Sequence, residues 1–173
     1  MNIKTVVRSA LAVGATFMTV NGYAANATAT ATATVITPIA ITKAVDLSFG
    51  KFARGVGGTV TVSNSGARTA SGTILSAVGS TPTAARFDVV GDNLATYSIA
   101  IAADATIVSG ANSMALAVTS DLTGANVTAG NVATGTLSGA GVQSIFIGGA
   151  LTVGAAQVPG AYTGNIVVTV EYN

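Results

Sequence analysis

Apolar and polar residues alternate with a period of two along much of this chain, which is the pattern of strands with one buried face. The alternation is strict in ATATATATV (residues 27–35), where the alanines and the final valine share one face and the threonines share the other. Further strand-like runs follow, separated by the turn sequences GVGG, NSG, GDN, SGAN and VPG. No stretch has the apolar spacing of an amphipathic helix, so the pattern predicts an all-β domain.

The predicted strands, with their adjoining turns, occupy eight segments of the chain. These segments are residues 36–52, 57–63, 71–78, 85–91, 95–102, 113–122, 135–153 and 162–172. Pro38 has no backbone N–H to donate, which places the first strand at a sheet edge or places Pro38 at a strand start. Short strands at regular spacing, with turns between them, predict an antiparallel β-sandwich or barrel.

The first 24 residues have the layout of a secretory signal peptide. Lys4 and Arg8 provide the positive start, residues 9–20 form an apolar run too short to span a membrane, and small residues follow. Either of two small-residue pairs suits a signal peptidase, at residues 22 and 24 or at residues 25 and 27. We expect export through the inner membrane, with no membrane span in the mature chain. The expected parts are an extension over 25–35 and a β-sandwich domain over 36–173.

Charged and reactive side chains are scarce in this chain. Only 8% of residues are charged, against about 25% in an average protein, and there is no cysteine, histidine or tryptophan. Without the signal peptide, five basic residues face six acids, so the net charge is −1 and no basic patch suggests a nucleic-acid partner. With no disulfide, stability must come from the apolar core or from another chain. A nearly neutral surface rich in β-formers favours self-association.

The composition also argues against an enzyme. Without histidine and cysteine the usual nucleophile–base pairs and transition-metal sites are missing, and a serine paired with Lys43 or Lys51 has no supporting motif. Asp88 and Asp92 flank the turn in FDVVGDN, where Asp92 is expected to cap the turn and a loose calcium site is the alternative. We therefore expect no catalytic residue, no cofactor and no metal.

The two ends of the mature chain carry the most specific patterns. At the C-terminus, Ile166, Val168, Val170 and Tyr172 share one face of an alternating strand, and Gly160 is the fourteenth residue counted from the end. An ordinary core strand would have the same alternation. At the N-terminus, residues 27–35 fit either a flexible linker or a strand that pairs with another chain.

An alternating C-terminal strand with a penultimate tyrosine and a glycine at that spacing resembles the C-terminal motif of chaperone–usher pilus subunits. Four segments together resemble a family of secreted bacterial domains related to chaperone–usher pilins and spore-coat-U-type subunits. They are residues 36–52, 87–101, 146–153 and 159–172. The resemblance implies an immunoglobulin-like, pilin-like antiparallel β-sandwich that lacks one strand and is completed by a donor strand.

The same resemblance implies a structural subunit of a bacterial surface fibre or coat, assembled head-to-tail by donor-strand exchange between identical or related subunits. The implied partners are a periplasmic chaperone and an outer-membrane usher, with transit through the periplasm to the cell surface. The candidate donor residues are Ala29, Ala31, Ala33, Val35 and Ile36. The candidate residues of the C-terminal assembly strand are Gly160, Ile166, Val168, Val170 and Tyr172.

This chain departs from the pilin pattern in two respects. Many pilins contain a disulfide, and this chain has no cysteine. Donor strands usually present large apolar residues, whereas this extension presents alanines up to Val35. The alternative function is a self-contained secreted binding or adhesion module that carries a Thr/Ala-rich linker.

Overall fold

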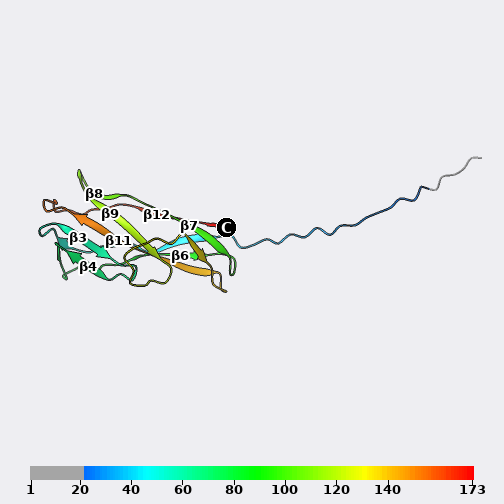
Figure 1. Cartoon of the computed structure of the whole chain (residues 1–173), viewed down its shortest axis with the longest axis horizontal. Coiled ribbons are helices and arrows are strands. Elements are labelled where there is room, and N and C mark those ends of the chain that lie inside the picture. Colours follow the sequence, from blue (N-terminus) through cyan, green and yellow to red (C-terminus); the bar gives the residue numbers. More distant parts are fainter. Residues whose placement is uncertain (1–21) are drawn as a thin grey trace, which may run out of the picture. The chain divides into compact units, whose positions relative to one another are not determined.

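The computed structural model describes residues 22–173, and over that range it is all-β (Figure 1). Contacts divide the chain into two units, residues 1–34 and residues 35–173. In the first unit, the described residues 22–34 have no assigned strand and are exposed throughout. Most of the predicted signal peptide lies outside the described residues. Residues 35–173 are called the body below.

The body contains twelve strands, and all their pairings are antiparallel. The strands are β1 (Ala40–Val45), β2 (Phe52–Ala53), β3 (Gly58–Val62), β4 (Arg68–Ser71), β5 (Ile74–Leu75), β6 (Ala85–Val90), β7 (Thr96–Ala103), β8 (Thr106–Ser109), β9 (Asn112–Asp121), β10 (Thr134–Thr136), β11 (Val142–Val153) and β12 (Ile166–Tyr172). They form a seven-stranded sheet, a three-stranded sheet in the order β10-β7-β12, and the small β2–β5 pair.

The long strand β11 organises the seven-stranded sheet. One edge of β11 pairs first with β6, over Val142–Ile147, and then with β3, over Gly149–Val153. The other edge pairs with β9, which in turn pairs with β8. The strands β1 and β4 lie outside β6 and β3 and end the sheet on that side. A single strand therefore joins both halves of the sheet.

A buried asparagine fills the point where β11 changes partner. Asn64 is fully buried, and its side-chain oxygen accepts hydrogen bonds from Gly148 N at 3.2 Å and Thr119 Oγ1 at 2.8 Å. Its amide nitrogen donates to Phe146 O at 3.4 Å. A Cβ at Gly148 would lie 2.5 Å from Val62 O, so only glycine permits this close approach. The asparagine satisfies backbone groups that the partner change would leave without a strand.

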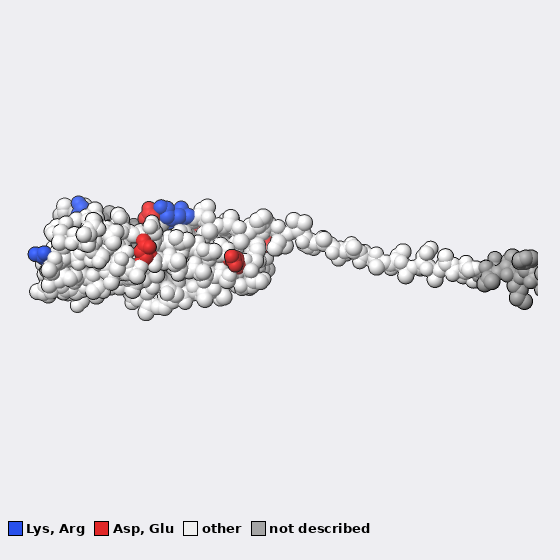
Figure 2. Space-filling view, turned by 90° about the horizontal axis from the view of Figure 1, so that it is seen from above, with Lys and Arg blue, Asp and Glu red and all other residues white. Residues whose placement is uncertain are grey.

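The two larger sheets share one apolar core, which makes the fold consistent with a β-sandwich. Its buried members are Ala85, Phe87, Val89, Ile145 and Ile147 from the seven-stranded sheet, Tyr97, Ile99 and Val168 from the three-stranded sheet, and Leu137 from a connecting segment. Charged side chains are sparse on the face shown in Figure 2, and the chain has no cysteine. Apolar packing and backbone hydrogen bonds therefore hold the body together.

The predicted strands over 57–63, 85–91, 95–102 and 113–122 are confirmed by β3, β6, β7 and β9, each within one residue at either end. Pro38 lies just before β1, which is an edge strand, as predicted. Within residues 22–173 no helix is assigned.

Three predicted segments are each interrupted in the structure, and two strands lie wholly or mostly outside the predicted segments. Residues 36–52 divide into β1 and β2, residues 71–78 contain the end of β4 and then β5, and residues 135–153 contain the end of β10 and then β11. Each break contains a glycine with positive φ: Gly50, Gly72 and Gly141. One is β8, whose four residues are too few to show alternation beside the SGAN turn. The other is β4, of which only Ser71 falls in a predicted segment.

The turn after β9 is held by a carboxylate. Asp121 Oδ2 accepts hydrogen bonds from Thr123 Oγ1 at 2.6 Å, Thr123 N at 2.8 Å and Ala125 N at 3.0 Å. The bond from the Thr123 hydroxyl, followed by the bond from the Ala125 amide, lowers the pKa of Asp121 to about 2. The ionised carboxylate therefore stabilises the folded body.

We predict that Asp121→Asn removes a pH-dependent part of the stability. Because the pKa of Asp121 is lowered from 3.8 to about 2 on folding, its contribution is complete above pH 4 and fades as the pH falls toward 2. In urea denaturation the free energy of unfolding of the wild type should exceed that of the variant at pH 6. The two values should become equal near pH 2. A difference that stays constant over this range would contradict the prediction.

We also predict that Tyr97→Phe raises the free energy of unfolding by about 1 kcal/mol. Tyr97 is fully buried, and its hydroxyl has no hydrogen-bond partner among the described residues. The variant keeps the ring in the core and removes a buried polar group that has lost its water. Urea denaturation of both proteins at neutral pH gives the comparison. A variant that is less stable than the wild type would show that the hydroxyl is satisfied in solution.

Candidate functional site: an apolar groove beside two unpaired strand edges

The last strand, β12, has one apolar face turned into the body. Val168 is buried, and Ile166, Val170 and Tyr172 pack against the core that the two sheets share. The intervening residues 167, 169 and 171 are exposed. The strand thus has the two faces that its alternation predicts, although it begins at Ile166 rather than near residue 162. The preceding residues make only an isolated bridge, between Thr163 and Val108.

One edge of β12 has no partner strand among the described residues. The strand pairs only with β7, with Tyr172 opposite Tyr97. Beyond the strand, Asn173 N donates to Thr96 O at 3.3 Å, so the odd-numbered residues direct their backbone groups toward β7. The backbone groups of Ile166, Val168 and Val170 therefore point to the opposite, unpaired edge.

The strand β1 is also an edge strand, and it belongs to the other large sheet. It pairs only with β6, and it approaches β12 across the body. The segment that leads into β1 is tied to the end of β12, because Tyr172 Oη donates to Thr37 O at 2.8 Å. Two unpaired edges from different sheets thus lie near each other without a strand between them.

An open groove with a volume of about 1130 Å³ lies beside these edges. One wall comes from Lys43 and residues 46–54, at the end of β1 and around β2, and the other from residues 157–166, just before β12. The floor is apolar and consists of Ile107, Met114, Leu116, Leu151 and Val153. This volume exceeds that of an ordinary small-molecule pocket. The cavity is called the groove below.

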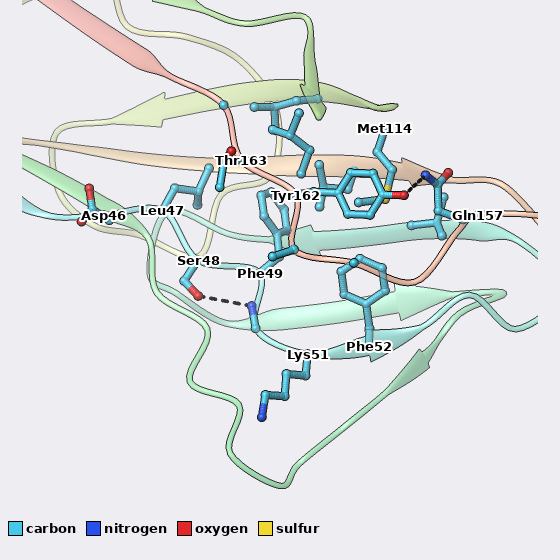
Figure 3. Close-up of a pocket in the computed structure, with 18 of the residues that line it drawn as sticks. Asp46, Leu47, Ser48, Phe49, Lys51, Phe52, Met114, Gln157, Tyr162 and Thr163 are labelled. Atoms are coloured by element: carbon cyan, nitrogen blue, oxygen red, sulfur yellow. Dashed lines mark hydrogen bonds between the residues drawn. The ribbon is translucent and has the colours of Figure 1, made fainter. Parts of the chain in front are cut away.

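Aromatic side chains from both walls enter the groove. Figure 3 shows the rings of Phe49, Phe52 and Tyr162 beside Met114, while the side chain of Lys51 points away from them. Phe49, Phe52 and Tyr162 are only partly buried, and they pack against a second apolar core that includes part of the floor. The groove therefore offers an apolar surface that the described chain leaves partly open to water.

Hydrogen bonds hold both walls of the groove in place. In the second wall, Tyr162 Oη accepts a bond from Gln157 Nε2 and donates one to Val158 O, each at 2.7 Å. In the first wall, Arg68 supplies the donors and uses no carboxylate: Nη1 donates to Phe49 O at 2.8 Å and to Lys51 O at 3.1 Å. The groove is therefore a formed feature of the body.

The hydroxyl of Tyr172 joins three distant parts of the chain. Besides its bond to Thr37 O, it accepts a hydrogen bond from Asp92 N at 2.6 Å in the turn between β6 and β7. The sequence predicted that the Asp92 side chain would cap this turn. That expectation was wrong: Ala95 N bonds to the backbone oxygen of Asp92, and Tyr172 satisfies the Asp92 amide.

Gly160, the glycine of the C-terminal motif, lies outside β12 on the rim of the groove. A Cβ at this position would lie 2.7 Å from Ser109 Oγ at the end of β8. The structure thus brings all five predicted C-terminal residues to the groove or to the strand that continues from it. The sequence analysis did not identify the other residues of the groove. The two aromatic residues in DLSFGKF, which lie outside a regular alternating pattern, were a usable sign of an apolar site there.

The candidate donor residues are accessible. Ala29, Ala31 and Ala33 are exposed and lie in a segment without assigned structure. Val35 is 96% exposed and Ile36 is 50% exposed, at the start of the body. Among the described residues, no three histidine, cysteine or acidic side chains gather as metal ligands. Over the same part of the chain, no helix has the length and apolar character needed to cross a membrane.

We predict that Tyr172→Phe lowers the free energy of unfolding by about 1–2 kcal/mol. The variant keeps the half-buried ring but removes the acceptor for Asp92 N and the donor for Thr37 O. Urea denaturation should show this loss, and amide exchange at Asp92 should accelerate. Tyr97→Phe is the matched control, because it removes the same hydroxyl oxygen and is expected to raise the free energy of unfolding rather than lower it. Unchanged stability together with unchanged exchange at Asp92 would contradict the prediction.

Comparison with known proteins gives a family without an assigned activity. Residues 39–172 match DUF4402, which is described as a domain of unknown function. The match begins just before β1 and ends with the last residue of β12, so it covers both unpaired edges and the groove. A search of curated proteins found no match. The match covers most of the chain, and the protein therefore belongs to the DUF4402 family.

Proposed function

We propose that this protein is a structural subunit of a bacterial surface fibre, or of a coat built in the same way. The extension of one copy would add as a strand to the next copy, between β1 and β12 and along the groove. The observation that carries the proposal is the pair of unpaired edges beside an open apolar groove. Edges of this kind invite pairing with another chain unless something covers them.

A strand is a suitable occupant for physical reasons. The backbone groups of Ile166, Val168 and Val170 that point away from β7 would gain partners, and so would those on the outer edge of β1. One inserted strand could bond to both edges and would close the two sheets into a complete sandwich. The proposed body is thus an immunoglobulin-like, pilin-like fold that lacks one strand.

The extension has suitable properties for a donor strand. It alternates with a period of two, contains no charged residue from Ala25 to Ile36 and has no assigned structure of its own. Val35 and Ile36 are its largest apolar side chains, and burying each would contribute about 1.5–3 kcal/mol before ordering costs. The alanines fill less space and allow the two backbones to approach closely.

Head-to-tail exchange requires the extension of another copy to enter from the N-terminal end of β12. The strands β1 and β12 run in opposite directions, because Thr37, just before β1, is bonded to Tyr172 at the end of β12, while Lys43 and Ile166 both line the groove. An inserted strand is therefore antiparallel to one of these edges and parallel to the other. In the proposed arrangement the donor runs antiparallel to β12 and enters beside the groove. A head-to-tail contact of this kind does not close on itself, so it produces a fibre.

A subunit with an open groove needs protection before assembly. We therefore include in the proposal a periplasmic chaperone that occupies the groove and an outer-membrane usher at which the exchange takes place. The route would lead from the signal peptide through the periplasm to the cell surface. The apolar floor and the half-exposed rings of the groove support a transient occupant, because free copies would otherwise aggregate.

The proposal predicts that the mature secreted chain forms polymers that require its extension. In a denaturing gel, unboiled wild type should give a ladder that collapses to one band on boiling, and thin fibres should appear in negative-stain images. Deleting residues 25–34 should abolish both, because it removes the donor strand and leaves the body intact.

A matched control tests the alternation itself. Rearranging residues 27–34 from ATATATAT to AATTAATT keeps length and composition but places alanines on both faces of the strand. The rearranged chain should polymerise poorly. A wild type that runs as one band in both lanes and forms no fibres would overturn the proposal. That outcome would favour the second candidate, a self-contained binding or adhesion module with a Thr/Ala-rich linker.

A further inference from the structure

The two ends of the body differ in charge. At the end where β12 finishes, Glu171 precedes Tyr172, and Asp92 is bonded to Tyr172 through its amide. We call this the acidic end. At the other end, Lys51 and Arg54 lie in the wall of the groove, and Arg54 Nη1 donates to Gln157 O at 3.1 Å. We call this the basic end.

The charges at both ends lack ion-pair partners in the described part of the chain. The two ion pairs found there are Lys43–Asp46 and Arg86–Asp88. Of the remaining acids, Asp104 accepts a bond from Asn165 N and Asp121 holds its own turn. On the face shown in Figure 2, the basic side chains at one end of the body stand apart from every acidic side chain.

Both ends also expose large apolar side chains. At the basic end these belong to Val56, Ile74 and Val78, close to the small β2–β5 pair. At the acidic end Leu94 is 68% exposed and adopts φ +59°, a left-handed conformation that is strained for a leucine. An exposed apolar side chain on a strained backbone is costly in a free body, and such positions concentrate at functional sites.

We propose that the acidic end of one copy docks against the basic end of the next copy, so that each fibre joint has a second contact besides the inserted strand. This proposal rests on the proposed function. Its partner is a second copy of this chain, because opposite charges and exposed apolar side chains occur on the two ends of the same body. Asp92, Glu171 and Leu94 would face Lys51, Arg54 and Val56.

The direction proposed for the inserted strand leads to the same pairing of ends. A donor strand antiparallel to β12 has its last residue near the N-terminal end of β12, which is the basic end of the acceptor. In the donor, Thr37 is bonded to Tyr172 at the acidic end. Only a few residues separate Val35 from β1, so the acidic end of the donor must lie close to the basic end of the acceptor.

The test measures the growth rate of polymers from the purified mature chain by light scattering, at about 20 mM and about 500 mM salt. Exposed charges attract less at high salt, because screening shortens their range to a few ångströms. The wild type should therefore grow several-fold more slowly at high salt. At low salt Lys51→Glu with Arg54→Glu should slow growth at least several-fold, and so should Asp92→Lys with Glu171→Lys. The chain with all four changes should recover most of the rate.

Two further variants separate the end contact from general charge effects and from folding. Thr69→Glu with Ala117→Glu adds two negative charges at exposed positions in β4 and β9 and should leave growth unchanged. Leu94→Gly removes the apolar side chain and relieves the strained φ, so it should slow growth while the body unfolds at an equal or higher urea concentration.

The possible outcomes distinguish the two proposals. Polymers that grow at the same rate in both salts and in both charge-reversed variants would overturn the end contact and leave strand exchange intact. The end contact would also be overturned if the variant with all four charge reversals grows as slowly as the variants with two. A wild type that forms no polymer at all would overturn the proposed function, and the end contact with it. The contact is supported if each variant with two charge reversals grows slowly and the variant with all four recovers most of the growth rate.

Discussion

The body depends on the fact that two sheets share one apolar core while the strands that end them, β1 and β12, have no partner across the gap. The core packs from both sides, and each edge strand still contributes its inner face to it. The backbone groups on the outer edges must then bond to water or to another chain. The groove lies beside the end of β1 and the start of β12, and its apolar floor comes from the second core rather than from the shared one.

The long strand β11 makes this open arrangement possible in a chain without disulfides. It serves β6, β3 and β9, and Asn64 fills the seam where its partner changes. A sheet anchored in its middle can leave its outer strands open at little cost to the core. Open edges and a firmly paired centre therefore occur together in one body.

Local pattern predicted the strands well because alternation follows directly from the period of the pleat. The faces of β12 are visible in the sequence for that reason, whereas the groove is not. Its walls and floor come from segments far apart in the chain, and its shape depends on loops such as residues 46–51 that Arg68 holds through backbone carbonyls. Long-range bonds from one hydroxyl or one guanidinium leave no local pattern, so neither Tyr172 nor Arg68 could be given its role from the sequence.

The position of Tyr172 in the last strand has a consequence for the order of folding during synthesis. A chain is synthesised from its N-terminus, so Thr37 and the turn at Asp92 are made long before the residue that bonds to them. Until Tyr172 has been added, Thr37 O has no donor and the amide of Asp92 lacks its acceptor. The start of the body and the turn between β6 and β7 are thus joined only by the last strand to be made, and a body cut short before Tyr172 would leave both groups without this hydroxyl.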